Sequence, residues 1–287
     1  MATIDELLKT LDRLPAIPVA VTRLIGNLCG DGDDPAAEPT ARIVMRDQAL
    51  STAVLRVANS AALGFQLPAV TVAEALSRVG ENQLLKIALA HASQAALGGP
   101  VDEYGLDEGE AWLGALAGAL AAEELARVTS ACDPNLAFTA GLLRDIGKLA
   151  MGLLVPGGEV FEVVSCGDRE GTGAERQAWG FDHAQVGAAL GRAWGLPDEL
   201  LHAVRFHHDP PRDPDLAEPL FDVVHCADSL VLMLGYGVGA DGLCYHVQPE
   251  SRAALGLDLA ATEEALVATR LRLDEYLTGQ DGPPTIT

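Results

Sequence analysis

The longest apolar run of the chain extends from Ala111 to Ala122 and contains only Ala, Leu, Gly and one Trp. It is too short for a transmembrane helix, which needs roughly 20 apolar residues. Because Ala and Leu are strong helix formers, the run predicts a helix over Glu110–Val128. Gly114 and Gly118 lie one turn apart in that helix, so another helix could approach it closely. The run therefore predicts a protein built from closely packed helices.

The rest of the composition supports an all-α fold. Hydrophobic residues make up 49% of the chain but aromatic residues only 5%, and most of the apolar residues are Ala, Leu and Val. Capping boxes are expected at Thr71 with Glu74 and at Asp182 with Gln185. Hydrophobic periodicity predicts further helices over Ile4–Leu11, Val19–Leu28, Ala41–Arg46, Gln48–Ala61, Thr71–Gly80, Glu81–Leu97, Leu136–Leu154, Ala184–Trp194, Glu199–Phe206, Leu220–Leu234 and Leu259–Leu277.

The clearest break in composition is Gly98, Gly99 and Pro100, followed by an acidic, glycine-containing stretch up to Gly109. Glycine and proline interrupt regular structure, so a boundary between two helical lobes is expected there. We expect an N-terminal lobe over residues 1–100 and a second lobe, with a C-terminal helix, over residues 101–287. Since the connection is short, the lobes should pack together through an apolar interface.

The chain carries 41 acidic and 19 basic residues, for a formal net charge of -22. This charge would repel nucleic-acid phosphates and an anionic membrane surface, so neither is expected as a partner. The N-terminus has no basic stretch followed by an apolar run, so a cytoplasmic protein is expected. Five cysteines form no CxxC pair and are expected to be reduced and buried: Cys29, Cys132, Cys166, Cys226 and Cys244.

Several short segments in the first 97 residues follow a particular order. Leu14–Pro18 comes first, then Arg46–Leu50, then Leu55–Ala61 with its Asn59-Ser60 pair, and then Ala73–Leu76 ahead of Val79-Gly80. In this order and spacing the chain resembles the HDOD domain family. The resemblance implies a multi-helical fold in which an N-terminal lobe packs on a second lobe related to the HD phosphohydrolases.

Asn59 and Ser60 also have a structural interpretation from their own chemistry. Both side chains compete for backbone hydrogen bonds, and Asn tolerates positive φ, so the pair predicts the end of a helix. Gly64 would permit the turn that follows. We expect the pair to fix a helix end and to contribute to packing, without a catalytic role.

The second half of the chain resembles an HD domain that has lost metal ligands. The resemblance implies a site made of a first His, an adjacent His-Asp pair and a distal Asp, which hold a metal that activates water. Arg144 and Asp145 stand at the His-Asp pair, and Gly114 stands at the first His. A guanidinium has no free lone pair and glycine has no side chain, so neither can bind a metal.

The remaining candidates for a metal site resemble later positions of the HD and HD-GYP patterns. His183 and Asp228 share helical stripes with apolar residues, so both should point inward and need polar partners. Two interpretations stay open: a retained divalent metal, or a hydrogen-bond and ion-pair network that includes Arg144. The candidates are Asp145, His183, His207, His208 and Asp228.

The loss of the metal would leave negative charge in the core, and Arg144 is expected to replace the missing cation. Asp145 is adjacent in sequence and should not share the helical face of Arg144, so Asp228 is the expected partner. The Gly-Tyr-Pro element of HD-GYP cyclic-dinucleotide phosphodiesterases is absent after His208, where the proline-rich segment Asp209–Pro214 follows.

The resemblance implies a non-catalytic regulatory or scaffold module in bacterial signal transduction, which acts by binding a protein or a ligand. The expected partner is a signalling protein, and no catalytic residue and no cofactor are expected. The alternative is a metal-dependent phosphohydrolase with an altered HD site and a retained divalent metal.

Overall fold

The computed structural model describes Ile4 and residues 40–46, 48–59, 65, 67–152, 172–239 and 246–279. Within these residues the regular structure is helical, apart from one isolated antiparallel bridge between Val101 and Leu106. The expected all-α fold is therefore confirmed. None of the described helices combines the length and the apolar character needed to cross a bilayer. Some residues for which the sequence made a prediction lie outside the described part of the chain. They are Ile4–Leu11 apart from Ile4, Leu14–Pro18, Val19–Leu28, Cys29, Ser60, Gly64, Cys166 and Cys244.

Most expected helices are present with small differences at their ends, and α10, α14 and the 3-10 turn η3 are additional to those expected. Their bounds are α3 (Thr40–Met45), α4 (Gln48–Ala58), α5 (Val72–Val79), α6 (Glu81–Leu97), η3 (Asp102–Tyr104), α7 (Glu110–Thr129), α8 (Pro134–Leu143), α9 (Gly147–Gly152), α10 (Gly173–Trp179), α11 (His183–Ala193), α12 (Asp198–Phe206), α13 (Pro219–Met233), α14 (Pro249–Ala254) and α15 (Leu259–Gly279).

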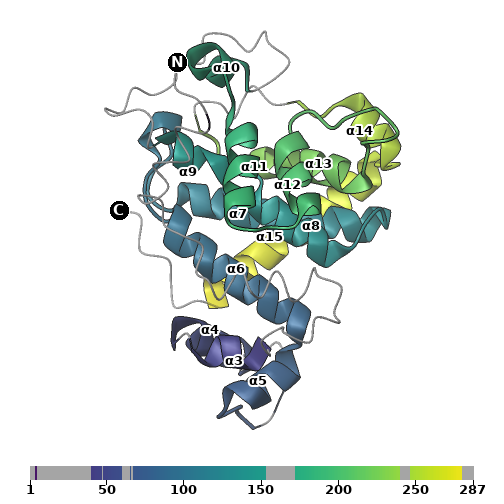
Figure 1. Ribbon diagram of the computed structural model, residues 1–287. Coiled ribbons are helices and arrows are strands. Elements are labelled where there is room, and N and C mark those ends of the chain that lie inside the picture. The colour runs from purple at the N-terminus through teal and green to yellow at the C-terminus, as the bar shows by residue number, and fades with distance from the viewer. Residues whose placement is uncertain are drawn as a thin grey trace.

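Helices α3, α4 and α5 form a small group at the foot of Figure 1, and α6 lies between them and the larger helical body. Asn59 follows α4, and its side chain donates to Ala69 O over 3.0 Å and accepts from Ala69 N–H over 2.6 Å. These bonds tie the end of α4 to the segment before α5.

The capping box expected at Thr71 and Glu74 is present in one half only. The Glu74 N–H donates to Thr71 Oγ1 over 3.1 Å, but the Glu74 carboxylate accepts from Val70 N–H instead of Thr71 N–H.

Helix α7 is the centre of the larger body, with α8, α13 and α15 packed against it. Another helix approaches closely at Gly118, as expected, whereas the neighbour at Gly114 is a turn and not a helix. A Cβ on Gly141 of α8 would lie 2.5 Å from Gly118 O, so the two backbones nearly touch. A Cβ on Gly114 would lie 3.0 Å from Gly237 Cα, in the turn after α13. The small residues of α7 therefore set how near its neighbours lie.

The connection that follows Pro100 is packed into the protein. Val101, Tyr104 and Leu106 are buried in a second apolar cluster together with Met151 and Phe181. Backbone hydrogen bonds between Val101 and Leu106, in both directions, close this segment into a compact loop. The loop brings Tyr104 toward the start of α11, where it contributes to the site described below.

The helix expected over Leu136–Leu154 is wrong as a single element, because the chain turns between α8 and α9. Ile146 N–H donates to Leu143 O over 3.0 Å, which tightens the end of α8. After the turn, α9 packs on α11 so closely that a Cβ on Gly147 would lie 1.9 Å from His183 O. This packing requires a change of direction that one straight helix would not give. Arg144 is the C-cap residue of α8, and Asp145 lies in the turn that follows it.

Five charged side chains join α6, α7 and α15 at a second place in the core. The Glu123 carboxylate is completely buried and pairs with Lys86 of α6 over 2.6 Å and with Arg272 of α15 over 2.8 Å. Arg127 also pairs with Glu123, and Glu124 pairs with both arginines. A buried carboxylate shared by three cations links α6, α7 and α15.

The two described cysteines have no disulfide partner. Cys226 is buried, as expected, whereas Cys132 is only half-buried. Burial raises the pKa of the Cys226 thiol to about 12 and that of Cys132 to about 11. Both thiols are therefore protonated at neutral pH, and protonated thiols are poor nucleophiles and metal ligands.

Candidate functional site

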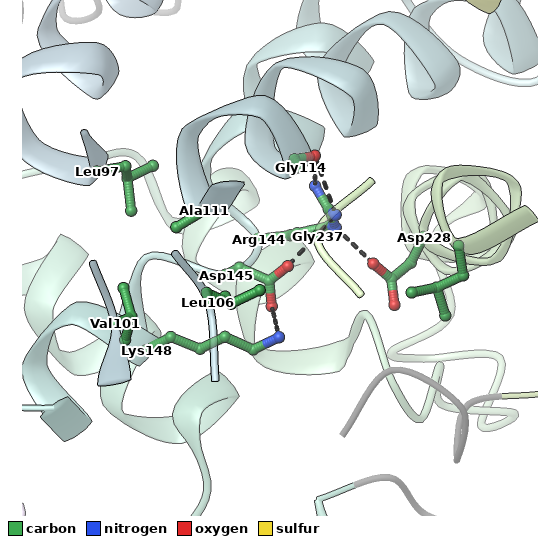
Figure 2. A pocket seen from close by; sticks show the side chains of 11 residues that line it. Leu97, Val101, Leu106, Ala111, Gly114, Arg144, Asp145, Lys148, Asp228 and Gly237 are labelled. Carbon is green, nitrogen blue, oxygen red and sulfur yellow. Dashed lines mark hydrogen bonds and ion pairs between the residues drawn. The ribbon is translucent and has the colours of Figure 1, made fainter. Parts of the chain in front are cut away.

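Arg144 lies at the end of α8 with its guanidinium in the interior, where it is 2% exposed. Its Nε donates to Asp228 Oδ1 over 2.7 Å, so the predicted pair with Asp228 is present. Its Nη1 and Nη2 donate to Gly114 O over 3.2 and 3.3 Å. Figure 2 shows the guanidinium between Gly114, Asp145 and Asp228. One cation thus contacts Gly114, Asp145 and Asp228, the three positions for which the resemblance to HD domains implied metal ligands besides Arg144.

The expectation that Asp145 points away from Arg144 is wrong. Arg144 Nη2 lies 3.3 Å from Asp145 Oδ2. Arg144 keeps helical backbone angles at the C-cap of α8 and Asp145 lies in the turn that follows, so the long arginine side chain reaches both this carboxylate and Asp228. Lys148 Nζ lies 3.2 Å from the other carboxylate oxygen, Asp145 Oδ1. Asp145 is therefore shared between two cationic side chains, as Figure 2 shows.

Little space remains beside this guanidinium. The cavity there has a volume of about 20 Å³, and its apolar wall includes Leu97, Val101 and Leu106. A water molecule needs a cavity of roughly 10–15 Å³ by the same kind of measure, so a nucleotide would not fit. Gly114 and Gly237 line this cavity, and a Cβ at position 114 would lie 3.0 Å from Gly237 Cα, so a larger side chain there would be crowded.

A second group of side chains, the histidine cluster, lies on the other side of Asp145. Asp145 comes from the α8–α9 turn, His183 begins α11, and His207 and His208 follow α12. The predicted capping box of Asp182 and Gln185 is complete and fixes the start of α11. Asp228 is not a member, because its carboxylate faces Arg144. One ligand atom from each member lies within 4.8 Å of all the others; the members are Asp145, His183, His207 and His208.

Hydrogen bonds on the outer side of the cluster fix the orientation of two imidazole rings. His183 Nδ1 lies 2.8 Å from a carboxylate oxygen of Glu175, which also accepts from the Tyr104 hydroxyl. His207 Nδ1 donates to Val204 O over 2.7 Å. The Nε2 atoms of both rings are thereby directed toward Asp145 Oδ1, at 3.3 Å from His183 and 3.9 Å from His207.

The protonation states within the cluster differ from ring to ring. Burial alone would lower the pKa of His183, but Glu175 and Asp145 outweigh it and raise the pKa to about 10. Burial lowers the pKa of His207 to about 4 and also lowers that of His208. Burial would raise the pKa of Asp145, yet Lys148 and Arg144 hold it well below its ordinary value. The cluster therefore contains one imidazolium, two neutral imidazoles and a carboxylate.

Three members of this site were not assigned a role from the sequence: Tyr104, Lys148 and Glu175. Glu175 precedes His183 by eight residues and reaches it across the turn at Gly180, so no helical spacing relates them. Tyr104 comes from a distant loop.

Three further histidines whose side chains the structure describes lie outside the cluster. His225 is hydrogen-bonded through both ring nitrogens to backbone atoms, while His202 and His246 are exposed.

The sequence model for the HDOD domain matches residues 14–210, which is more than half of the chain. The chain belongs to the HDOD family. The match includes the N-terminal landmarks, Arg144 and all four members of the histidine cluster. It ends before Asp228, which lies on α13.

Two relatives of this HDOD protein extend well beyond the matched region. An uncharacterized protein of Treponema pallidum (strain Nichols) is 25% identical over 238 residues, which are 81% of this chain and 44% of that protein. Ribonuclease Y of Thermus thermophilus is 37% identical over 116 residues, which are 40% of this chain and 14% of the enzyme. The chain therefore spans less than half the length of these relatives.

Solved structures share the fold of the HDOD chain at low sequence identity. An HDOD domain protein of unknown function from Geobacter sulfurreducens is 23% identical, with a TM-score of 0.64 and coverage of 96% and 93% of the two chains. A candidate signal transduction protein of Marinobacter aquaeolei is 22% identical, with a TM-score of 0.67 and coverage of 96% and 59%. A candidate phosphohydrolase of Shewanella amazonensis is 23% identical, with a TM-score of 0.56 and coverage of 92% and 97%.

Proposed function

We propose that this HDOD domain is a non-catalytic regulatory module of bacterial signal transduction, which acts in the cytoplasm by binding a signalling protein. The observation that carries the proposal is the position of Arg144. Its guanidinium contacts Gly114, Asp145 and Asp228, the three remaining positions of the HD metal pattern. A fixed positive charge there would repel a metal ion and would leave no place for the water that the metal activates.

The space for a substrate supports the same proposal. A hydrolase needs room for a phosphate group next to its nucleophile, and ligand pockets usually measure about 300–1,000 Å³. Here the cavity beside Arg144 and Asp145 has a volume of about 20 Å³ and is bordered by the Gly114–Gly237 contact. Binding of a partner on the surface requires no such cavity.

The rival function is phosphate-ester hydrolysis, for which the candidate phosphohydrolase and ribonuclease Y among the similar proteins are the reason. The 287-residue chain should be incubated with Mn²⁺, Fe²⁺ or Mg²⁺ and with nucleotides, cyclic dinucleotides, single-stranded RNA and a chromogenic phosphate ester. We expect product formation to stay at the level of the protein-free control. Metal-dependent turnover that disappears in a folded Asp145→Ala variant would overturn the proposal and establish the hydrolase.

A further inference from the structure

Apolar side chains lie on both faces of α15, the helix that packs against α7 on the far side of the larger body in Figure 1. Ala265 and Leu273, on the inner face, are completely buried. On the outer face, Val267 and Leu271 are 56% and 58% exposed. A surface helix of a globular protein normally has one apolar and one polar face, whereas a helix that is apolar all round is normally buried. The outer face of α15 is therefore more apolar than a solvent-facing helix requires.

Helix α12 shows the usual pattern for comparison. Its apolar residues Leu200 and Val204 are buried, while Glu199 and His202 on its other side are exposed. Single exposed apolar residues are common and need no explanation. On α15, however, two of them lie one helical turn apart and form a continuous stripe along the outer face. Such a stripe is the usual form of a contact between two helices.

Two opposite charges flank the stripe. Glu263 and Arg270 are both exposed and seven residues apart, so they lie at nearly the same edge of α15, about 10.5 Å apart along its axis. Val267 lies between them along the axis. Arg270 pairs with Asp274 over 2.9 Å, but these two side chains are 52% and 47% exposed. Because an exposed pair of this kind contributes little to stability, Arg270 can exchange it for another carboxylate.

We propose that the outer face of α15 binds the same face of a second copy of this chain, in an antiparallel pair about a two-fold axis beside Val267. In an isologous pair of antiparallel helices, residues on either side of the axis face one another at the same edge. Glu263 of each copy then faces Arg270 of the other, which gives two ion pairs. The Val267 side chains meet near the axis, and Leu271 packs over the exposed Ala260 of the other copy.

Charge limits how tightly the two copies bind. Each chain has a formal net charge of -22, and Glu264 shares the outer face of α15. Repulsion between the whole chains is screened beyond about 8 Å at physiological ionic strength, whereas ion pairs in direct contact are screened less. We therefore expect a weak dimer, which forms well above the low-micromolar concentrations used to measure unfolding. This self-association is independent of the proposed binding of a signalling protein.

Sedimentation equilibrium of the 287-residue chain, from micromolar to millimolar concentration at physiological ionic strength, measures the association. We expect a monomer–dimer equilibrium without larger species, because an isologous interface is complete after two copies. Val267→Glu places two like charges beside the axis and should abolish the dimer. A wild-type chain that stays monomeric throughout this range, or that forms open-ended chains, would overturn the proposal.

Charge reversal tests the antiparallel geometry. Glu263→Arg leaves arginine facing arginine across the interface, and Arg270→Glu leaves glutamate facing glutamate. Each variant alone should therefore dimerise about tenfold or more weakly than the wild type. An equimolar mixture of the two variants should recover the wild-type affinity, because every arginine again faces a glutamate. A role of these residues within a single chain would not produce recovery on mixing.

Two control variants make the same changes in net charge at exposed positions of other helices. Glu199→Arg on α12 and Arg192→Glu on α11 should dimerise like the wild type. Circular dichroism checks that every variant is folded, as expected for substitutions of exposed residues. Dimers that persist in folded Glu263→Arg alone, or a mixture of the two reversals that does not recover, would mean that something other than a second α15 covers this face, and would overturn the proposal.

Discussion

Arg144 Nε lies 2.7 Å from Asp228 Oδ1, and the two side chains are only 3% and 11% exposed. The same guanidinium contacts Asp145, so one fixed cation serves two carboxylates in the interior. Burial of the two carboxylates without a cation would be strongly unfavourable. The arrangement makes the stability of the fold depend on Arg144.

Arg144→Ala is expected to lower the free energy of unfolding by about 3–5 kcal/mol, because it leaves Asp145 and Asp228 buried without this cation. Denaturant unfolding measures the change. Arg192→Ala, on the exposed side of α11, is the control and should change stability by about 0.5 kcal/mol or less. A loss as small as that of the control would show that the guanidinium does not neutralise the core.

The coupling between Arg144 and Asp228 can be measured with a double-mutant cycle. Because the side chains are in direct contact, the effects of Arg144→Ala and Asp228→Ala should be non-additive by about 1–3 kcal/mol. The double variant should be more stable than the sum of the single losses predicts. Additive losses would mean that the two residues stabilise the fold independently, against the contact seen here.

Histidines at positions 114 and 144 should not give the protein hydrolytic activity. A side chain at position 114 would meet the backbone of Gly237. Even its Cβ would lie only 3.0 Å from the Cα of Gly237. Gly114→His should cost about 1–3 kcal/mol through overpacking, and the Gly114→His/Arg144→His variant should stay inactive with Mn²⁺ or Fe²⁺. Gly99→His, at an open position, controls for the histidine itself. Metal-dependent turnover by a folded double variant would contradict this expectation.

The contact between α9 and α11 should tolerate no side chain at Gly147. A Cβ there would lie 1.9 Å from His183 O and 2.7 Å from Gly187 N, and these backbone atoms cannot rotate away. Gly147→Ala should therefore lower the free energy of unfolding by about 1–3 kcal/mol. Gly99→Ala has no atom within 4 Å of the new methyl group and should be neutral. Equal thermal unfolding of the two variants would argue against this close packing.

Glu123 should make the protein sensitive to acid. Burial would raise the pKa of this carboxyl, but Lys86 and Arg272 outweigh it and hold the pKa below its ordinary value of 4.5. A folded-state pKa below the unfolded value means that the stabilisation is complete above about pH 5 and is lost as the pH falls through the folded-state pKa.

Wild-type stability should consequently fall more steeply below about pH 5 than that of Glu123→Gln, which lacks the titrating group. The substitution itself should cost about 3 kcal/mol near neutral pH, because it removes the buried partner of three cations. Unfolding curves at a series of pH values give both quantities. Glu263→Gln, on the exposed face of α15, should keep the wild-type slope; the same slope in Glu123→Gln would refute the assignment.

Local sequence patterns determined much of this protein. The helical class and the capping box at Asp182 follow from residue types and short spacings. These features depend on backbone propensity and side-chain chemistry within one or two turns, which a sequence displays directly. The pairing of Arg144 with Asp228 was also predicted, because the resemblance to HD domains pointed to Asp228 and a buried guanidinium needs an acidic partner.

Tertiary packing decided the rest. The break between α8 and α9 depends on the fit of Gly147 against α11, and it brings Asp145 next to both Arg144 and the histidines. The separation of Asp228 from the histidine cluster, and the support of His183 by Glu175, follow from where three helix ends meet. Hydrophobic periodicity specifies which face of a helix is buried but not its axial position or its partner, and only these determine which distant side chains converge.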